Sequence, residues 1–259
     1  RLAFKHVKSN NGAPGIDGQT VKDFQTRLEE NLAAIHAELK TNTYQPSPVR
    51  RVEIEKEDGS KRPLGIPTVK DRVVQQALRQ IIEPIFEPDF HPSSYGYRPN
   101  RSCQMAVAKA EQFLRRYGLT YVVDMDLSKC FDTLDHERII AGVNKKISDG
   151  RILQLIRQFL KAGVMEDGAV QETEIGSPQG GVISPLLANI YLDEFDQKMK
   201  ARGIRIVRYA DDILVFATSL RQAKKHQEIA TRILEEDLGL TVNRTKTHIT
   251  SLEKGVSYL

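Results

Sequence analysis

The 259-residue chain lacks several features that mark whole classes of protein. It has only two cysteines, Cys103 and Cys130, which excludes a disulfide framework and favours an intracellular protein. No apolar run approaches the roughly 18 to 20 residues of a membrane span, so we expect no membrane partner. No Cys/His cluster has the spacing of a zinc site. What remains is an ordinary globular composition, 40% hydrophobic and 28% charged, enough for one large domain or two modest ones.

Positive charge gathers in the first half of the chain. Residues 1–120 contain 19 Lys and Arg against 14 Asp and Glu, a net charge of +5, whereas residues 121–259 contain 19 against 20. A basic half suits a polyanionic partner such as nucleic acid. A solvated charged surface explains the same excess, so charge alone leaves both interpretations open.

Periodicity and turn residues predict the main elements. We expect a hairpin over 49–67, and strands over 121–127, 169–175, 240–242 and 248–250. Residues 204–217 should form a strand, a tight turn and a second strand. We expect helices over 21–40, 71–82 and 102–117, mainly helical structure over 136–163, and further helices beginning at Ser184 and over 221–238. On the helix over 71–82, Val74, Leu78, Ile81 and Ile82 should face inward. Helices beside a small, mostly antiparallel sheet predict an α+β fold. Residues 1–8 resemble the tail of a helix and 256–259 an unfinished strand, so we expect an excised fragment.

Two adjacent carboxylates, Asp211 and Asp212, lie between apolar strand sequences. They repel each other and are poorly hydrated there, so a cation should offset their charge. An Asp-rich turn without any ligand is the common alternative. Asp124 and Asp126 change the balance, because residues two apart on a strand point to one face. Two such strands can converge on a pair of divalent ions, although a solvated edge strand would carry the same residues.

The chain resembles reverse transcriptases, and the group II intron branch in particular. Tyr209-Ala210-Asp211-Asp212 resembles the family's YxDD motif, and it is accompanied in the family's order by further blocks. These are Asn10–Gly18, Arg62–Gln75 and Ser94–Pro99 upstream, then Tyr121–Asp132 (motif A), Gly176–Asn189 (motif B) and Gly239–Lys246 (motif D). The resemblance implies right-hand fingers over 1–115 and a palm over 116–259, with a helical fingers insertion around 136–172. It also implies that the thumb and maturase regions are absent.

The resemblance implies which residues hold metal. The family binds two Mg²⁺, with Mn²⁺ possible, through a motif A aspartate and the YxDD pair. Because the family places an aromatic residue five positions after that aspartate, Asp126 with Phe131 fits and Asp124 does not. Asp126, Asp211 and Asp212 are then the ligands, with the Leu127 carbonyl as a helper. Lys246 resembles the motif D lysine proposed to protonate pyrophosphate, although a plain surface lysine is the alternative.

The resemblance also implies a nucleotide pocket and a nucleic-acid path. Phe131 resembles the steric gate against a 2′-hydroxyl, with core packing as its alternative, and Gln179 resembles the motif B glutamine. Basic positions of the finger hairpin that would contact a dNTP triphosphate are Arg50, Lys56 and Arg62. Residues expected along the template are Asn11, Gly12, Pro14, Arg98 and Arg101, although Arg98 could equally be a structural salt-bridge partner.

These expectations describe an RNA-directed DNA polymerase that acts by two-metal nucleotidyl transfer. Its expected partners are an RNA template, a DNA primer, dNTPs and intron RNA, in a ribonucleoprotein of the bacterial cytoplasm, with a homodimer also open. The excised fragment alone should extend primers weakly. An RNA-binding splicing cofactor with a remnant polymerase site is the alternative, and related retroelements such as retrons would carry the same residues.

Overall fold

The computed structural model describes residues 1–55, 59, 61–166, 169–171, 176 and 180–252. The chain divides into two compact units, each built from two separate stretches of sequence. The first unit comprises Arg1–Phe86 and Asp135–Leu187, and the second comprises Glu87–Leu134 and Ala188–Leu259. None of the described helices combines the length and apolar character that a membrane crossing requires.

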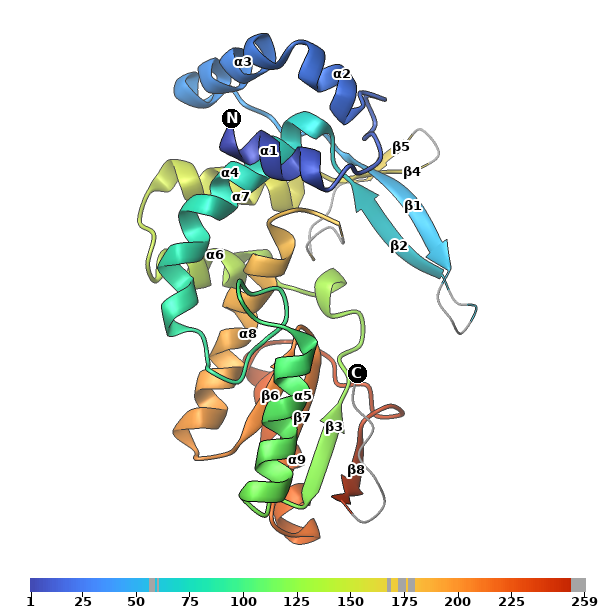
Figure 1. The fold of residues 1–259 in the computed structure, drawn as a ribbon, viewed down its shortest axis with the longest axis vertical. Coiled ribbons are helices and arrows are strands. Elements are labelled where there is room, and N and C mark those ends of the chain that lie inside the picture. The colour runs from blue at the N-terminus through green and yellow to red at the C-terminus, as the bar shows by residue number, and fades with distance from the viewer. Residues whose placement is uncertain (56–58, 60, 167–168, 172–175, 177–179, 253–259) are drawn as a thin grey trace. The chain divides into compact units, whose positions relative to one another are not determined.

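The first unit places helices beside a mixed four-stranded sheet (Figure 1). Its sheet has the order β2-β1-β4-β5, in which β1 is antiparallel to β2 and parallel to β4. These strands span Val49–Glu55 (β1), Lys61–Ile66 (β2), Val164–Glu166 (β4) and Ala169–Gln171 (β5). Its helices span Leu2–Ser9 (α1), Val21–Thr26 (α2), Leu28–Thr41 (α3), Val69–Phe86 (α4), His136–Asn144 (α6) and Gly150–Lys161 (α7).

Two expectations for this unit are wrong in detail. The helix predicted over 21–40 breaks at Arg27, which has φ −119° and ψ 39°. The Asn31 side-chain amide donates to the carbonyl of Phe24 at 3.0 Å, so a side chain replaces the backbone partner that the break removes. Ile81, predicted to face inward on α4, is 58% exposed, because the buried stripe runs along Val74, Leu78 and Ile82 instead.

The second unit is built on a fully antiparallel sheet of order β6-β7-β3-β8 (Figure 1). Its strands span Tyr121–Met125 (β3), Ile206–Tyr209 (β6), Asp212–Ala217 (β7) and His248–Ser251 (β8). Its helical segments span Cys103–Glu111 (α5) with the π-helical turn Gln112–Arg116 (η2), Cys130–Asp132 (η3), Leu220–Arg232 (α9) and Ile233–Asp237 (η4). Helix α8, Ser184–Ala201, starts in the first unit and runs mostly in the second.

The core of the second unit explains why its sheet is so apolar. Val122, Leu214 and Phe216 pack on Ala106 and Phe113 of the α5–η2 segment. Side chains alternate between the two faces of a strand, so the neighbouring Val123, Met125, Ile213 and Val215 point to the opposite face, and these are fully buried too.

Candidate active site

Strand register brings the two carboxylate-bearing segments to one end of the second sheet. Strand β3 pairs with β7 from Tyr121 opposite Ala217 to Met125 opposite Ile213. One residue beyond the Met125–Ile213 pair, Asp126 after β3 lies opposite Asp212 of β7. Asp211 occupies the turn between β6 and β7, immediately before Asp212.

The carboxylates lie close enough to disturb one another electrostatically. The pKa of Asp212 is raised to about 6, first by burial of its carboxyl and then by the negative charges of Asp211, Asp126 and Asp124, with Lys246 opposing. Burial and the charge of Asp126 also raise the pKa of Asp124, against the opposing effect of His248. This end of the sheet therefore carries negative charge that a cation would offset.

The Asp126, Asp211 and Asp212 carboxylates and the Leu127 carbonyl are oxygen ligands of the kind that a hard divalent cation prefers. Carboxylate and carbonyl oxygens are the ligands that Mg²⁺ prefers. Among the residues that the structure describes, no three His, Cys, Asp or Glu side chains already converge tightly enough to hold a metal ion. The Asp212 pKa is the observation that supports the fit, because neighbouring carboxylates contribute to the shift beside burial.

The turn that carries Asp211 is held by an unusually close backbone contact. Tyr209 pairs with Asp212, and Ala210 takes a positive φ of 56°, which is uncommon for a residue with a side chain. A Cβ on Gly96 would lie only 2.2 Å from the Ala210 nitrogen, so this approach requires glycine. The segment containing Gly96 therefore fixes the position of the turn.

A buried polar network supports the same turn from inside the unit. The Arg208 guanidinium donates to both oxygens of Asp196 at 2.6–3.0 Å, and both side chains have no solvent exposure. It also donates to the Ala210 carbonyl at 2.9 Å and to Asn189 Oδ1 at 3.0 Å. Asn189 in turn donates to the Gly96 carbonyl at 2.9 Å. These hydrogen bonds connect helix α8 to Ala210 in the turn and to Gly96, which packs against Ala210.

One spacing in the sequence is consistent with this network. Asn189 and Asp196 are seven residues apart on helix α8, and that spacing puts both on one face. Their common partner, Arg208, directly precedes the Tyr-Ala-Asp-Asp segment. Burial lowers the pKa of Arg208, but the charge of Asp196 and its hydrogen bonds outweigh this effect and raise the pKa above its ordinary value.

Asp126 is held by Asn243 of the loop over 241–247, a contact that the sequence did not predict. The Asn243 side-chain amide donates to Asp126 Oδ2 at 2.9 Å, and the Asn243 backbone N–H donates to the Asp126 carbonyl at 2.8 Å. Leu127, expected to offer its carbonyl to metal, is buried and forms an isolated bridge with Val242 of the same loop. Lys246, later in this loop, is exposed and acts on Asp212 through its charge.

Phe131 lies in the short η3 turn and is 7% exposed. Its ring meets the ring of Tyr97 edge-on, with centroids 6.4 Å apart and an interplanar angle of 81°. Tyr97 is half exposed and has a positive φ of 58°. The aromatic pair therefore fixes the orientation of Phe131, which both a steric gate and a packed core residue would require.

The expected triphosphate contacts fall only partly within the described structure. Lys56 and Gln179 lie outside the described residues, as does the side chain of Arg62, whose backbone belongs to β2. Arg50 is half-buried and donates to the Pro14 carbonyl at 3.1 and 2.8 Å. In this structure Arg50 therefore secures the Asn10–Gly18 loop.

A second arginine, Arg72 of helix α4, contacts the Asn10–Gly18 loop. Arg72 donates to the Ala13 carbonyl at 2.8 Å, and a Cβ on Gly12 would lie 2.5 Å from its guanidinium. Asn11 takes a positive φ of 39° at the start of the loop. These contacts give Gly12 and Pro14 a structural part in the first unit, while their contact with a template stays a prediction.

The two arginines predicted near the template differ in what they contact. Arg98 is 7% exposed and its donors go to the Glu87 carboxylate at 2.8–3.1 Å and to three backbone carbonyls. This is the salt-bridge role that the sequence left open. Arg101 donates to the Pro92 carbonyl at 2.6 Å and lies over the Tyr95 ring, 5.3 Å from its centroid.

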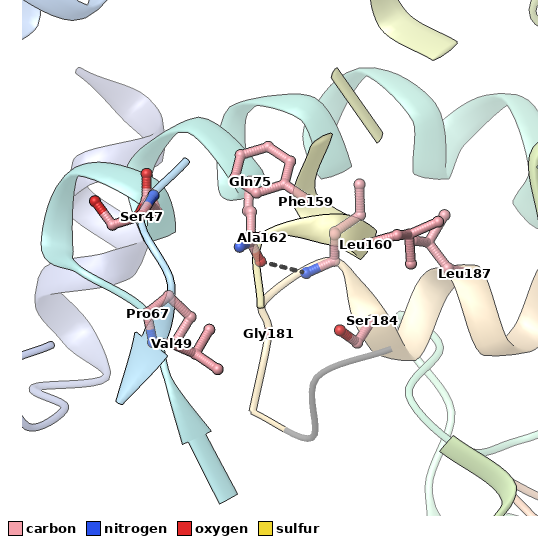
Figure 2. Close-up of a pocket in the computed structure, with 12 residues that line it drawn as sticks. Ser47, Val49, Pro67, Gln75, Phe159, Leu160, Ala162, Gly181, Ser184 and Leu187 are labelled. Carbon is pink, nitrogen blue, oxygen red and sulfur yellow. Dashed lines mark hydrogen bonds between the residues drawn. The ribbon is translucent and has the colours of Figure 1, made fainter. Parts of the chain in front are cut away.

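A small pocket in the first unit supports the motif B segment. It has room for about one water molecule. The Gln75 side chain, which lines the pocket in Figure 2, accepts a hydrogen bond from the Ile183 N–H at 3.3 Å. Asp71 in its wall accepts from the Ser47 N–H at 3.1 Å and the Thr68 hydroxyl at 2.7 Å. All its lining residues belong to the first unit, whereas the four carboxylates belong to the second.

Comparison with known proteins agrees with this geometry. A family model described as reverse transcriptase (RNA-dependent DNA polymerase) matches residues 54–259. Protein YkfC of Escherichia coli is 38% identical over 99% of this chain and 78% of its own length. Group II intron-encoded protein LtrA of Lactococcus lactis is 44% identical over 76% of this chain, but that match spans only 32% of LtrA.

A solved structure supports the fold. Telomerase from Candida albicans, in complex with a fragment of telomeric RNA, matches 92% of this chain and 47% of its own with a TM-score of 0.66 at 14% identity. At this identity the match bears on the fold alone, which is α+β with polymerase-like small sheets, as predicted. The chain therefore belongs to the reverse transcriptase family, on the branch of the group II intron-encoded proteins.

Proposed function

We propose that this chain holds the catalytic centre of an RNA-directed DNA polymerase that uses two Mg²⁺ ions, bound through Asp126, Asp211 and Asp212. Reverse transcriptases depend on divalent cations in general. The observation that carries the proposal for this chain is the strand register, which brings Asp126 next to Asp212 and Asp211 at one end of the sheet. Burial and the charges of these carboxylates raise the pKa of Asp212 accordingly. Mn²⁺, which accepts the same oxygen ligands, is the expected substitute.

The reaction joins the 3′-hydroxyl of a primer to the α-phosphate of a dNTP and releases pyrophosphate. Asp126, Asp211 and Asp212 would hold the two ions, with the Leu127 carbonyl as a further ligand. Such ions would supply a lower pKa for the attacking hydroxyl and neutralisation of charge on the phosphates. Lys246 delivers a proton to the departing pyrophosphate. Arg50, Lys56 and Arg62 bind the triphosphate, while Phe131 and Gln179 line the sugar and base side of the pocket.

The division of labour between the units follows from where these residues lie. We assign the second unit, which contains all four carboxylates, to the palm, and the first unit, with its β1–β2 hairpin, to the fingers. Asn11, Gly12 and Pro14 of the first unit belong to the template path in this assignment.

Substitution of the turn aspartate tests the metal assignment. In the full-length protein, Asp211→Ala should reduce Mg²⁺-dependent dNTP incorporation on an RNA template to background. Glu228→Ala, which removes an exposed carboxylate from α9, is the matched control and should keep the wild-type rate. Incorporation by Asp211→Ala at the wild-type rate would refute the assignment.

Binding of intron RNA is a second proposed function. Relatives such as LtrA are intron-encoded, and residues 1–120 carry a net charge of +5. Such a protein would work in a bacterial cytoplasm as a ribonucleoprotein, alone or as a homodimer. Filter binding to structured intron RNA should be the same for wild type and Asp211→Ala, because the cation ligands are not needed to hold RNA. Loss of RNA binding in Asp211→Ala would contradict a separate binding function.

A further inference from the structure

The loop Thr241–Thr247 wraps around the end of β3 at Asp126. The Ser128 N–H donates to the Thr241 carbonyl at 2.9 Å, and the Asn243 N–H donates to the Asp126 carbonyl at 2.8 Å. The Asp126 N–H points back to the Thr247 hydroxyl at 3.4 Å. Backbone groups on both sides of Asp126 are therefore tied to one loop.

The Asn243 side chain uses its two ends for different purposes. Its amide nitrogen donates to Asp126 Oδ2 at 2.9 Å. Its amide oxygen accepts from the Thr245 N–H at 3.2 Å, the Thr245 hydroxyl at 2.8 Å and the Lys246 N–H at 3.3 Å. A carboxylate can only accept and a backbone N–H can only donate, so only this amide orientation satisfies every partner.

The Asn243 amide nitrogen contacts Asp126, and its amide oxygen organises the turn that contains Lys246. Holding Oδ2 fixes the rotation of the Asp126 side chain, and within the described residues it leaves Oδ1 to a cation. The turn organised by the amide oxygen carries Lys246, whose charge acts on Asp212. Glu235 steadies the loop from behind, accepting from the Val242 N–H at 3.2 Å and from Arg244 at 2.6 Å.

We propose that Asn243 is a positioning residue that aims Asp126 at the shared cation and, through the same side chain, sets the turn that presents Lys246. This inference rests on the proposed polymerase function. Outer partners of a metal ligand fix its orientation, and their loss typically costs about 10- to 100-fold in metal affinity or activity. Asn243 would therefore affect the reaction without touching substrate.

The first test is Mn²⁺ affinity, measured by electron paramagnetic resonance on the full-length protein. Asn243→Ala should weaken Mn²⁺ binding by about tenfold. It should also lower kcat with little change in the KM for dNTP, because nucleotide contacts are untouched. A folded Asn243→Ala protein with wild-type Mn²⁺ affinity and wild-type kcat would overturn the proposal.

A second variant covers the case in which Asn243→Ala does not fold. Asn243→Asp keeps the oxygen that organises the turn and replaces the amide nitrogen with an oxygen that repels Asp126. At saturating Mn²⁺ its kcat should fall by at least about tenfold. Gln227→Glu on α9 makes the same amide-to-acid change elsewhere and should keep the wild-type kcat. An unchanged kcat for Asn243→Asp would also overturn the proposal.

Asp126→Asn separates failure of this inference from failure of the proposed function. If wild type binds Mn²⁺ and Asp126→Asn weakens that binding while Asn243→Ala does not, only the role of Asn243 is refuted. If wild type binds no Mn²⁺ and incorporates no dNTP, the polymerase proposal itself fails.

Discussion

At the scale of single residues, Asp212 carries an electrostatic cost that should be measurable without any substrate. Its pKa is raised from 3.8 to about 6 in the folded protein, so the folded state binds this proton more tightly than the unfolded state does. The ionised form is therefore destabilising. The penalty is absent below about pH 4, grows as the pH rises towards 6 and is complete above it.

Asp212→Asn should consequently stabilise the metal-free protein at pH 7.5 and leave its stability nearly unchanged at pH 4. Asp212 is exposed to solvent, which screens the effect, so we expect a gain of about 1 kcal/mol, or roughly 2–4 °C in Tm. Thermal melts in EDTA at the two pH values measure this difference. An equal Tm for both proteins at pH 7.5 would show that the carboxylates do not strain the fold.

Phe131 is the residue that should decide sugar selectivity. Its ring is held edge-on by Tyr97, so it can act as a rigid wall. Phe131→Ala in the full-length protein should raise ribonucleotide incorporation relative to dNTP by at least about tenfold. Single-nucleotide incorporation on an RNA template gives the ratio, with Tyr117→Ala as a control on an exposed ring. An unchanged ratio would leave Phe131 with a packing role only.

At the scale of elements, the ion pair between Arg208 of β6 and Asp196 of α8 should be a strong structural tie. Both side chains are fully buried, so removing one partner leaves an uncompensated charge. Arg208→Met should cost about 3–5 kcal/mol of folding free energy. The double variant Arg208→Met/Asp196→Leu should cost less than the sum of the two single variants.

Urea unfolding of the four proteins of this cycle measures the coupling. Arg208 also donates to Asn189 and the Ala210 carbonyl, so the double variant should not recover the full wild-type stability. Additive single effects would mean that the pair is not coupled and that the Asp211 turn is held by other contacts.

Local patterns in the sequence predicted the elements that local forces decide. The β1–β2 hairpin and the helix beginning at Ser184 follow from alternation and turn residues over short spans. The break at Arg27 has no such signal, because it depends on the side chain of Asn31 capping a carbonyl seven residues earlier. Arg208 and Asn243 were missed for the same reason, since their partners are 12 and 117 residues away in the chain.

At the scale of the whole molecule, the α+β fold and the family could be predicted, and the resemblance, though not periodicity, implied a helical fingers insertion around 136–172. Each unit joins two stretches of sequence, since residues 135–187 return to the first unit. Side-chain periodicity carries no information about such a return. The carboxylate site was predictable in its residues, whereas the register that sets Asp126 opposite Asp212 required the folded sheet.

The charge of the molecule makes a prediction about its RNA contacts. The net charge of +5 over residues 1–120 should make RNA binding largely electrostatic and independent of sequence. Affinity for a structured RNA should fall by at least about tenfold between 50 and 200 mM salt. Filter binding across that range measures the slope, and an affinity that does not change with salt would contradict a phosphate-dominated contact.

The central claim is that carboxylates from two separate strands share metal ions. Anomalous diffraction from Mn²⁺-soaked crystals of the full-length protein tests it most directly. We expect a Mn²⁺ peak within about 2.0–2.3 Å of oxygens from both Asp126 and Asp211. Crystals with no peak there, or with Mn²⁺ bound to only one of the two strands, would contradict it.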